Sequence, residues 1–316
     1  MSTMQAPLEA FLAERLGAPV VVSGLRRLGG GSSKEHWSFD GAWAGGSWPL
    51  LLRRDPEAGV VETSSAVEAI LLERLAATGL PTPAVHAVDA DGSWFGRPAV
   101  VLERLPGAAH RAVLRDKDPL SLGSGRRALA RDLAGLLAGV HRIAGLEDVL
   151  PVSGAHEELE RAEREAHLVA LEPLPEVALA LTWLRAHLPA PVAPVLVHGD
   201  FRPANVLVQD GHISALLDWE LARLGDPLDD LGWHTCSLYR GEHFFDGWAV
   251  QDLIASYELE SGMPVDPASL RFWQVLSVLR LVVIALRALR SFAEGTLDRP
   301  TAPPVYLLRR LLVDLG

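Results

Sequence analysis

The feature that most constrains the fold is a change in the spacing of apolar residues at Leu105-Pro106-Gly107. Before this point, short runs that are typical of β-strands alternate with turns, at residues 20–23, 36–40, 49–53, 84–88 and 99–103. Residues 64–77 instead place apolar side chains at helical spacing, and this stretch ends before Gly79 and Pro81. We therefore expect residues 1–104 to form a small β-rich lobe that carries one helix.

After residue 107, apolar residues recur with a helical period over residues 126–141, 156–171, 177–188, 248–261, 267–292 and 305–315. A β-type insert at residues 195–197, 206–208 and 213–217 interrupts this pattern. Its last two runs are joined by Gln209-Asp210-Gly211, which is a strong hairpin signal. The sequence therefore predicts an α+β fold with two lobes, a β-rich N-lobe at residues 1–104 and a larger, mainly helical C-lobe at residues 105–316 that contains the hairpin.

The composition excludes several classes of protein. With 316 residues, 49% of them hydrophobic, the chain can bury a core in each of two lobes. Its 40 acidic and 29 basic residues give a formal charge of −11, which argues against bulk attraction to nucleic acid or to anionic membranes. Residues 1–16 do not read as a secretory signal, and two arginines interrupt the most apolar stretch, residues 275–289. We expect a cytoplasmic protein without a nucleic-acid or membrane partner, whose oligomeric state the sequence does not indicate.

The densest group of polar residues lies at 198–205 (HGDFRPAN) and, after the hairpin, at 218–220 (DWE). Phosphoryl transfer needs a carboxylate that orients the attacking hydroxyl, and hard oxygen ligands for the magnesium ions on the nucleotide phosphates. Asp200 would be the catalytic base, and Asn205 and Asp218 would be the metal ligands. Arg202 would place a fixed positive charge where the transferring phosphate carries negative charge.

Each of these residues, taken alone, is more simply a turn former, because Asp and Asn are common in turns. Three of them in this order, with a hairpin of suitable length between them, favour the functional interpretation. We interpret His198 as a structural residue that holds the loop, because Asp200 already supplies a base.

This segment resembles the catalytic and metal loops of the aminoglycoside phosphotransferase and choline kinase-like family, whose members are relatives of the protein kinases. The resemblance implies a protein-kinase-like fold, with a nucleotide-binding N-lobe and a catalytic, substrate-binding C-lobe. It also implies use of ATP and Mg²⁺, with Asp200 as base and with Asn205 and Asp218 on the metal. The resemblance extends through residues 225–231 (GDPLDDL), where we expect Asp230 to tether the catalytic loop.

The same resemblance assigns the nucleotide side. A glycine-rich turn would bring its backbone amides close to the phosphates, through Gly29, Gly30, Gly31 and Ser32. Arg53 matches the strand lysine that contacts the phosphates, and it differs from the family in being an arginine. Its expected partner on the helix is Glu68, in preference to Glu73. Arg54, the next residue, should point to the opposite face of the sheet.

Residues 100–105 (VVLERL) resemble the segment that binds adenine, with contacts near Glu103 and Leu105. Such contacts use backbone groups and leave little trace in a sequence, so ATP is expected over GTP from the resemblance alone.

Three alternatives remain. A protein kinase usually carries His-Arg-Asp, Asp-Phe-Gly and Ala-Pro-Glu, and their absence here favours a small hydroxylated substrate over a protein. A nucleotide-binding pseudokinase would keep the fold without turnover. A metal-dependent hydrolase would use His198, Asp200 and His212, whose spacing is unconvincing.

The acceptor would dock against the late helices. Seven arginines in residues 271–316 argue against a polycationic aminoglycoside and for a neutral or anionic hydroxyl compound. Aromatic residues at 233–248, together with Trp273 and an Arg280, Arg287 and Arg290 face, are the candidate lining, although a core role is the simpler interpretation for most of them.

Overall fold

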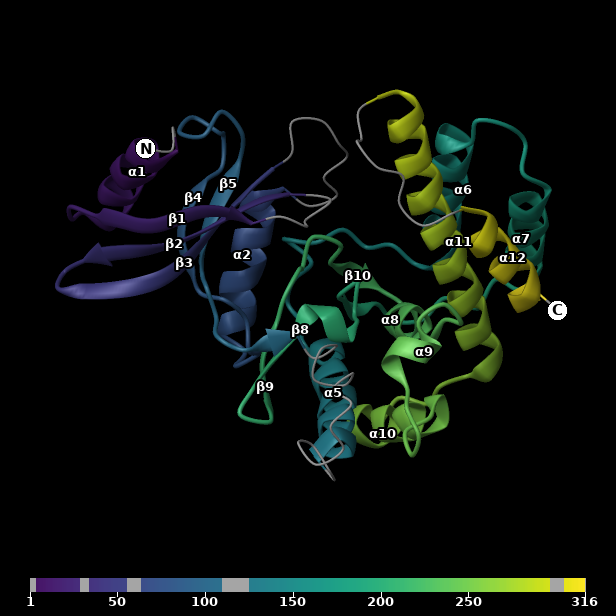
Figure 1. Ribbon diagram of the computed structural model, residues 1–316. Helices are drawn as coiled ribbons and strands as arrows, with labels where there is room; N and C mark the ends of the chain where they lie inside the picture. Colours follow the sequence, from purple (N-terminus) through teal and green to yellow (C-terminus); the bar gives the residue numbers. More distant parts are fainter. Residues whose placement is uncertain (1–3, 29–33, 56–63, 110–124, 296–303, 316) are drawn as a thin grey trace. The chain divides into compact units, whose positions relative to one another are not determined.

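The computed structural model describes residues 4–28, 34–55, 64–109, 125–295 and 304–315, and the chain divides into two compact units. The first unit comprises residues 1–109 and 206–221, and the second comprises residues 110–205 and 222–316. The described elements of the first unit (Figure 1) are α1 (Gln5–Leu16), β1 (Val21–Leu28), β2 (Glu35–Trp43), β3 (Gly46–Arg54), α2 (Ser65–Ala76), β4 (Val85–Asp89), β5 (Ala99–Glu103), β6 (Ala108–Ala109), β8 (Val206–Gln209) and β9 (His212–Leu216).

An antiparallel sheet with the strand order β1-β2-β3-β5-β4 forms the body of the first unit. Leu50 and Leu52 of β3 point to one face, where they join a core cluster that includes Phe11 and other residues of α1. Arg53 follows Leu52 in the sequence and points to the other face, where it contacts α2. The side chains of β3 therefore separate an apolar face from a polar one.

Helix α1 is an element that the sequence analysis does not anticipate. Its residues Leu8, Phe11 and Leu12 follow helical spacing and are completely buried against the sheet. The helix is short and its other positions are mixed, so its three-residue apolar stripe is easily overlooked. The first unit therefore contains two described helices, where one was expected.

The hairpin β8–β9 turns at Asp210 and Gly211, whose φ angles are 51° and 82°. Positive φ at both positions of a two-residue loop is the geometry that matches the twist of a hairpin, and it suits Asp followed by Gly. The short strand β6 pairs with β8, and the backbone N–H of Leu216 donates to the carbonyl of Pro81 at 2.8 Å. These contacts group the hairpin with the first unit, whereas the sequence analysis assigns it to residues 105–316.

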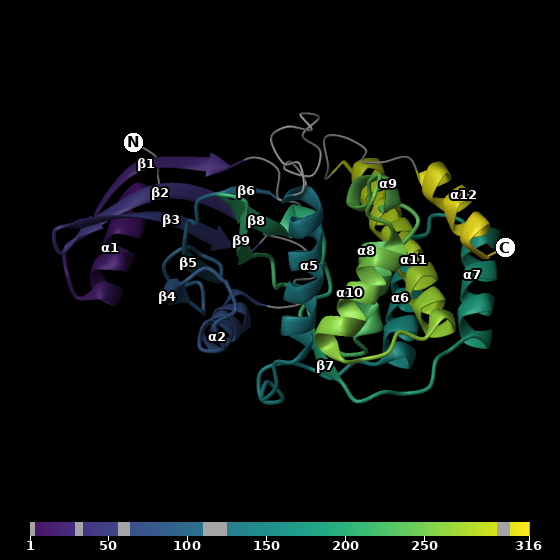
Figure 2. The same ribbon diagram turned by 90° about the horizontal axis from the view of Figure 1, so that it is seen from below.

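The second unit is mainly helical, as expected. Its described elements are α5 (Gly125–His141), α6 (Ala155–Val169), α7 (Pro175–Ala186), β7 (Val195–Val197), the 3₁₀ turn η1 (Pro203–Asn205), β10 (Arg223–Gly225), α8 (Leu228–Thr235), α9 (Arg240–His243), α10 (Val250–Ser261), α11 (Pro267–Ala293) and α12 (Pro304–Leu315). Helix α11 packs against α6, α7, α8 and α12 (Figure 2). The strands of the antiparallel pair β7–β10 flank, in the sequence, the segment that contains residues 198–205 and the hairpin β8–β9.

By length and composition, α11 could also cross a membrane, because its most apolar window has a mean hydropathy of 1.8. However, 61% of that window is buried within the structure, as in the core helix of a globular unit. Helix α11 packs tightly against α8, where a Cβ atom added to Gly232 would lie 2.5 Å from the Cβ of Trp273. Only glycine allows the two helices to pack at this distance.

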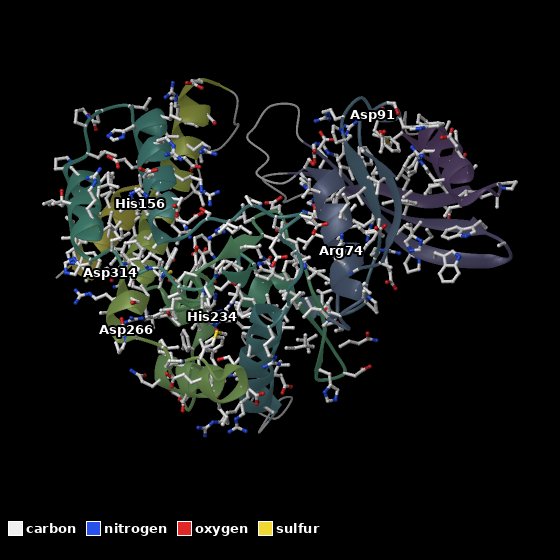
Figure 3. The ribbon with its side chains drawn as sticks, turned by 180° about the vertical axis from the view of Figure 1, so that it is seen from behind. Arg74, Asp91, His156, His234, Asp266 and Asp314 are labelled. Atoms are coloured by element: carbon white, nitrogen blue, oxygen red, sulfur yellow. The ribbon has the colours of Figure 1, made fainter. Side chains whose placement is uncertain are left out.

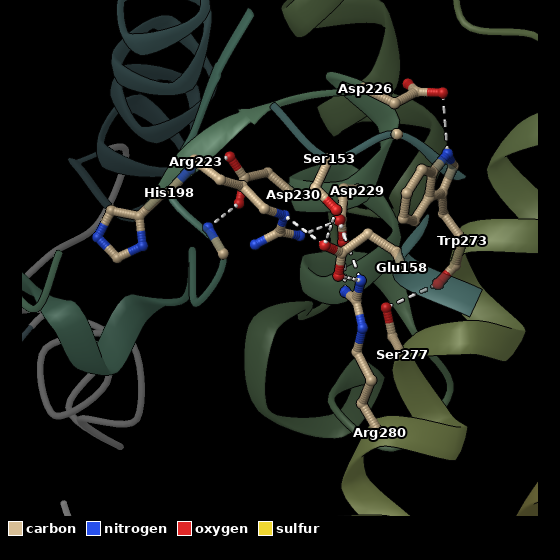
Figure 4. A network of polar contacts seen from close by, with 12 residues as sticks. Ser153, Glu158, His198, Arg223, Asp226, Asp229, Asp230, Trp273, Ser277 and Arg280 are labelled. Atoms are coloured by element: carbon tan, nitrogen blue, oxygen red, sulfur yellow. Dashed lines mark hydrogen bonds and ion pairs between the residues drawn. The ribbon is translucent and has the colours of Figure 1, made fainter. Parts of the chain in front are cut away.

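A buried ionic cluster joins α6, β10, α8 and α11 in the second unit (Figure 4). The Glu158 carboxylate pairs with Arg223 and Arg280, and the Asp229 carboxylate pairs with the same two arginines. Burial alone would raise the pKa of Glu158, but Arg223, Arg280 and Arg161 outweigh it and lower the pKa from 4.5 to about 2. The alternating charges connect elements that are spread from residue 158 to residue 280 of the sequence.

This cluster should make the second unit sensitive to acid. A carboxyl group with a pKa of 4.5 when unfolded and about 2 when folded stabilises the folded state above the higher value, and this contribution is lost as the pH falls through that window. Its contribution to the free energy of unfolding is on the order of 3 kcal/mol. We expect Glu158→Gln to lower the thermal unfolding midpoint at neutral pH and to flatten its decline between about pH 5 and pH 2. The exposed neighbour Glu160, changed to Gln, is the control; equal pH slopes in wild type and Glu158→Gln would contradict the prediction.

Candidate active site

The loop at residues 198–205, which is the candidate catalytic loop, is held by Asp230 at the start of α8. The backbone N–H groups of His198 and Gly199 donate to its two carboxylate oxygens, each at 2.8 Å. His141 Nε2 lies 3.2 Å from the same carboxylate, and Asp230 is completely buried. Burial would raise the pKa of Asp230, but the hydrogen bond and charge of His141, together with His198, outweigh it and lower that pKa. The tether expected from the sequence is confirmed.

His198 also has the structural role that was expected. Its ring is completely buried, and its Nδ1 atom accepts a hydrogen bond from the backbone N–H of Asp200 at 3.2 Å. Gly199, between these two residues, has a φ of 84°, which a residue with a Cβ rarely adopts. The imidazole and the glycine together turn the chain so that Asp200 follows at the tip of the loop.

Three N–H groups hold the Asp200 carboxylate. Asn205 Nδ2 donates to Oδ2 at 2.7 Å, and Trp233 Nε1 donates to Oδ1 at 2.8 Å. Arg202 Nε lies 2.9 Å from Oδ1 and 3.0 Å from Oδ2. Asp200 is 9% exposed, so its carboxylate is nearly enclosed but still reachable. The structure therefore brings Asp200, Arg202 and Asn205 together, and the side-chain geometry of the candidate base is closely constrained.

Asn205 ends the turn η1, and its amide is oriented by two hydrogen bonds from Nδ2, one to the carboxylate of Asp200 and one to the backbone carbonyl of Asp200 at 2.9 Å. Because the nitrogen is used in this way, the amide oxygen points away from Asp200. An amide oxygen is one of the hard ligands that Mg²⁺ prefers. Asn205 therefore fits the expected metal role in its chemistry.

In the first unit, Arg53 lies between two acidic residues on the polar face of the sheet. Its Nη1 atom donates to Glu68 Oε1 at 2.6 Å, and its Nη2 atom donates to Asp218 Oδ1 at 2.9 Å. Burial would lower the pKa of Arg53, but Glu68, Asp218 and Glu220 outweigh it and raise that pKa. The Nε atom is buried and has no hydrogen-bond partner among the described residues. A buried donor without an acceptor is costly, so this atom is suited to a further anion.

Asp218 has a φ of 68°, in the left-handed region that residues other than glycine rarely adopt. The next residue, Trp219, is completely buried, and its Nε1 atom donates to the carbonyl of Leu216 at 3.2 Å. The tryptophan thus anchors the turn after β9 and supports the strained backbone of Asp218. Strain of this kind concentrates at functional sites.

The remaining predicted nucleotide residues have different outcomes. Gly29, Gly30, Gly31 and Ser32 lie outside the described residues. Glu103 and Leu105 are half-buried at the end of β5, and the backbone N–H of Glu103 donates to Ala84.

Glu68, not its rival Glu73, faces Arg53: Glu68 is completely buried and Glu73 is exposed. Arg54 lies on the opposite face of β3 and pairs with Glu35, as strand alternation predicts.

Lys34 is a buried residue of this group that the sequence analysis missed. Its Nζ atom lies 2.7 Å from Glu68 Oε2, and its side chain is 0% exposed. The alternation of side chains along a strand offered a signal for Lys34. It directly precedes β2 and lies two positions before His36, which is the register partner of Arg53.

Most of the expected acceptor lining serves the core instead. Trp273, His234 and Trp248 are buried, as packed aromatic residues usually are. Arg280 pairs with the buried acids Glu158 and Asp229, so the arginine face that suggested an anionic acceptor is largely a structural feature.

A metal-dependent hydrolase would need a group of side chains around its ion. Within the described parts of the chain, no three His, Cys, Asp or Glu side chains are grouped to hold a metal ion. Mg²⁺ in kinases is commonly held by one or two protein ligands together with substrate phosphates, so a site of that kind does not need such a group.

The sequence profile of the phosphotransferase enzyme family matches residues 24–273, and the chain belongs to this family. Among curated proteins, it is similar to acyl-CoA dehydrogenase family member 10 of Mus musculus, with 26% identity over 293 residues. The match covers 84% of this chain and 27% of that protein, so the chain spans about a quarter of the length of this relative.

Two solved structures share the fold. One, from Ralstonia eutropha, was solved as a candidate aminoglycoside phosphotransferase; its TM-score is 0.72 at 21% identity, covering 98% of this chain and 95% of that one. The other is a thermostable mutant of aminoglycoside phosphotransferase APH(4)-Ia in a ternary complex with AMP-PNP and hygromycin B. Its TM-score is 0.67 at 19% identity, covering 98% and 97% of the two chains. The predicted α+β, protein-kinase-like fold is confirmed.

Trp233 offers a test of how tightly the carboxylate must be held. Trp233→Phe removes the N–H donor to Asp200 and keeps a ring that can pack against Tyr239, whose ring centre lies 5.8 Å away. We expect the kcat of phosphate transfer to fall about tenfold while the KM for ATP stays unchanged, because only the orientation of Asp200 is loosened. Trp183→Phe, in the same unit, is the matched control. An unchanged kcat in Trp233→Phe would show that the indole hydrogen bond is dispensable.

Proposed function

We propose that this protein is an ATP-dependent small-molecule kinase that transfers the γ-phosphate to a substrate hydroxyl. The observation that carries the proposal is the Asp200 carboxylate, held by the N–H groups of Asn205, Arg202 and Trp233 at the tip of a loop whose chain continues directly into the hairpin that ends at Asp218. A carboxylate fixed in this way is what a transfer to a hydroxyl requires.

On the acceptor side, Asp200 would accept a hydrogen bond from the substrate hydroxyl, orient its oxygen towards the phosphorus, and take up its proton as the new bond forms. Arg202 remains charged at all relevant pH values and lies beside that carboxylate. It would stabilise the negative charge of the transferring phosphate.

On the nucleotide side, Arg53 would contact the phosphates, with Glu68 holding its guanidinium in place. Its buried Nε atom supports this role, because that donor has no acceptor among the described residues. The predicted contributions of Gly29, Gly30, Gly31 and Ser32 to the phosphates, and of Glu103 and Leu105 to adenine, remain part of the proposal. The similarity of this chain to a structure that contains AMP-PNP supports ATP as the phosphate donor.

Mg²⁺, when bound with the nucleotide, would neutralise charge on the phosphates, and Asn205 and Asp218 would be its protein ligands. Both residues offer oxygen atoms, and the amide of Asn205 is already oriented by its contacts with Asp200. Arg53, which pairs with Asp218 in the structure, limits charge repulsion there before a metal binds.

A cavity of about 460 Å³ in the second unit is a candidate for the acceptor site. One wall is apolar and includes Ile254, Leu270 and Val275, while Arg240 and Arg271 add positive charge. Asp314, labelled in Figure 3, also lines it and hydrogen-bonds to Ser237. This lining favours a neutral or anionic hydroxyl compound over a polycationic one.

The cavity is connected to the catalytic loop through Tyr239. Its ring packs on Trp233, the residue that binds Asp200, and the next residue, Arg240, lines the cavity. Burial raises the pKa of Tyr239 above its usual value, and the charges of Arg202 and Asp200 also act on this group. Asp200 and the cavity are therefore linked by a short series of contacts within one unit.

The proposal is tested by ADP release from ATP and Mg²⁺, first alone and then with a library of hydroxylated compounds. We expect release to rise with a suitable acceptor, to stop when Mg²⁺ is chelated, and to fall by a factor of about 100 or more in Asp200→Asn. Asp210→Asn, the same chemical change in the exposed hairpin turn, should have no effect. ATP binding without turnover under every condition would instead indicate a pseudokinase.

The charge of the acceptor is a separate prediction. If the cavity binds it, Arg240→Ala should raise the KM for an anionic acceptor about tenfold and leave the KM for ATP unchanged, because a charge-assisted contact is lost. Arg287→Ala is the control, since Arg287 pairs with Glu165 and does not line the cavity. Preferred turnover of polycationic compounds by the wild type would contradict this assignment.

A further inference from the structure

Two cations share the carboxylate of Glu68 in the first unit, one on each oxygen. Lys34 Nζ lies 2.7 Å from Oε2, and Arg53 Nη1 lies 2.6 Å from Oε1. The side chains of Lys34 and Glu68 are 0% and 1% exposed, so this contact is shielded from water. Buried lysines are rare, and removing an ammonium group from water is costly unless it is well paired.

The position of Lys34 is supported from its other side. Its Nζ atom lies 3.7 Å from Asp55 Oδ1, and that carboxylate accepts a 2.6 Å hydrogen bond from Ser65 Oγ at the first residue of α2. The ammonium group is thus placed between an acid at the end of β3 and an acid on α2, Glu68. This arrangement gives the lysine little freedom to move away.

The consequence concerns Arg53. An arginine and a carboxylate that meet without competition commonly pair through two parallel hydrogen bonds. Here Lys34 occupies one oxygen of Glu68, and Arg53 contacts that carboxylate through Nη1 alone. Its Nη2 atom instead contacts Asp218, and its buried Nε atom has no partner among the described residues.

We propose that Lys34 is a positioning residue for nucleotide binding. By holding one oxygen of Glu68, it restricts Arg53 to a single contact with that carboxylate and leaves the buried Nε–H of the guanidinium, which has no partner among the described residues, for a phosphate. The role of the single strand lysine of related kinases is then divided between Lys34, which anchors Glu68, and Arg53, which contacts the nucleotide. This inference rests on the proposed ATP-dependent function.

The test measures the Kd of ATP in the presence of Mg²⁺ by isothermal titration calorimetry on the full chain. We expect Lys34→Met to raise the Kd about tenfold, because Glu68 can then take two N–H groups of Arg53. Lys34→Gln, which keeps an N–H donor for the same oxygen, should have a smaller effect. Thermal unfolding of each variant without nucleotide verifies that it is folded.

A double-mutant cycle separates this role from a merely structural one. In a Glu68→Gln background, adding Lys34→Met or Lys34→Gln should change the Kd no further, since Lys34 acts through Glu68. Arg54→Met, which breaks an ion pair on the opposite face of β3, should leave the Kd unchanged. If Lys34→Met does not fold, Lys34→Gln in the two backgrounds provides the same comparison.

The outcomes distinguish the two claims. The role of Lys34 is overturned if the wild type binds ATP and both Lys34 variants have the same Kd as the wild type. It is also overturned if their effects on the Kd add to that of Glu68→Gln. Either result leaves the proposed function standing. A wild type that does not bind ATP with Mg²⁺ overturns both.

Discussion

The Asp230 carboxylate, completely buried, accepts the backbone N–H groups of His198 and Gly199, and the geometry of the catalytic loop depends on these two hydrogen bonds. Backbone groups in a sharp turn must find partners when they are withdrawn from water, and a carboxylate can serve two of them at once. Burial raises the pKa of that carboxylate, but the hydrogen bond and charge of His141, together with His198, outweigh it and lower that pKa. With the turn fixed, Asp200 follows at a defined position, where Asn205 and Trp233 orient its side chain.

Buried charges organise both units, and each has a distinct physical consequence. In the second unit, Glu158 lies between Arg223 and Arg280, so helices that are distant in the sequence are joined by ionic contacts. In the first unit, Glu68 lies between Lys34 and Arg53. Pairs of this kind add little net stability over apolar packing, but breaking one leaves an uncompensated charge, so they make the local arrangement specific.

Much of the fold was predictable from the spacing of apolar residues. Most strands of the first sheet, α2 and the long helices lie within a few residues of the expected ranges, because their apolar spacing is regular, whereas β1 extends to Leu28, five residues beyond its expected run. Helix α1 was missed because it has only three buried residues on one short stripe, Leu8, Phe11 and Leu12. The hairpin was recognised from Asp210 and Gly211, but its grouping with the first unit depends on pairing with β6, which is too short to show a period.

The sequence by itself determined which residues are the candidates for the site, because the order and spacing of Asp200, Asn205 and Asp218 around a hairpin can be read from neighbouring residues. Only the tertiary structure decided which side chains contact the candidate residues, among them Asp200 and Glu68. Lys34 and Trp233 are far from Glu68 and Asp200 in the sequence, and a lysine or tryptophan in isolation does not indicate its partner. Contacts between residues separated by tens of positions follow from the packing of whole elements, and no local pattern encodes that packing.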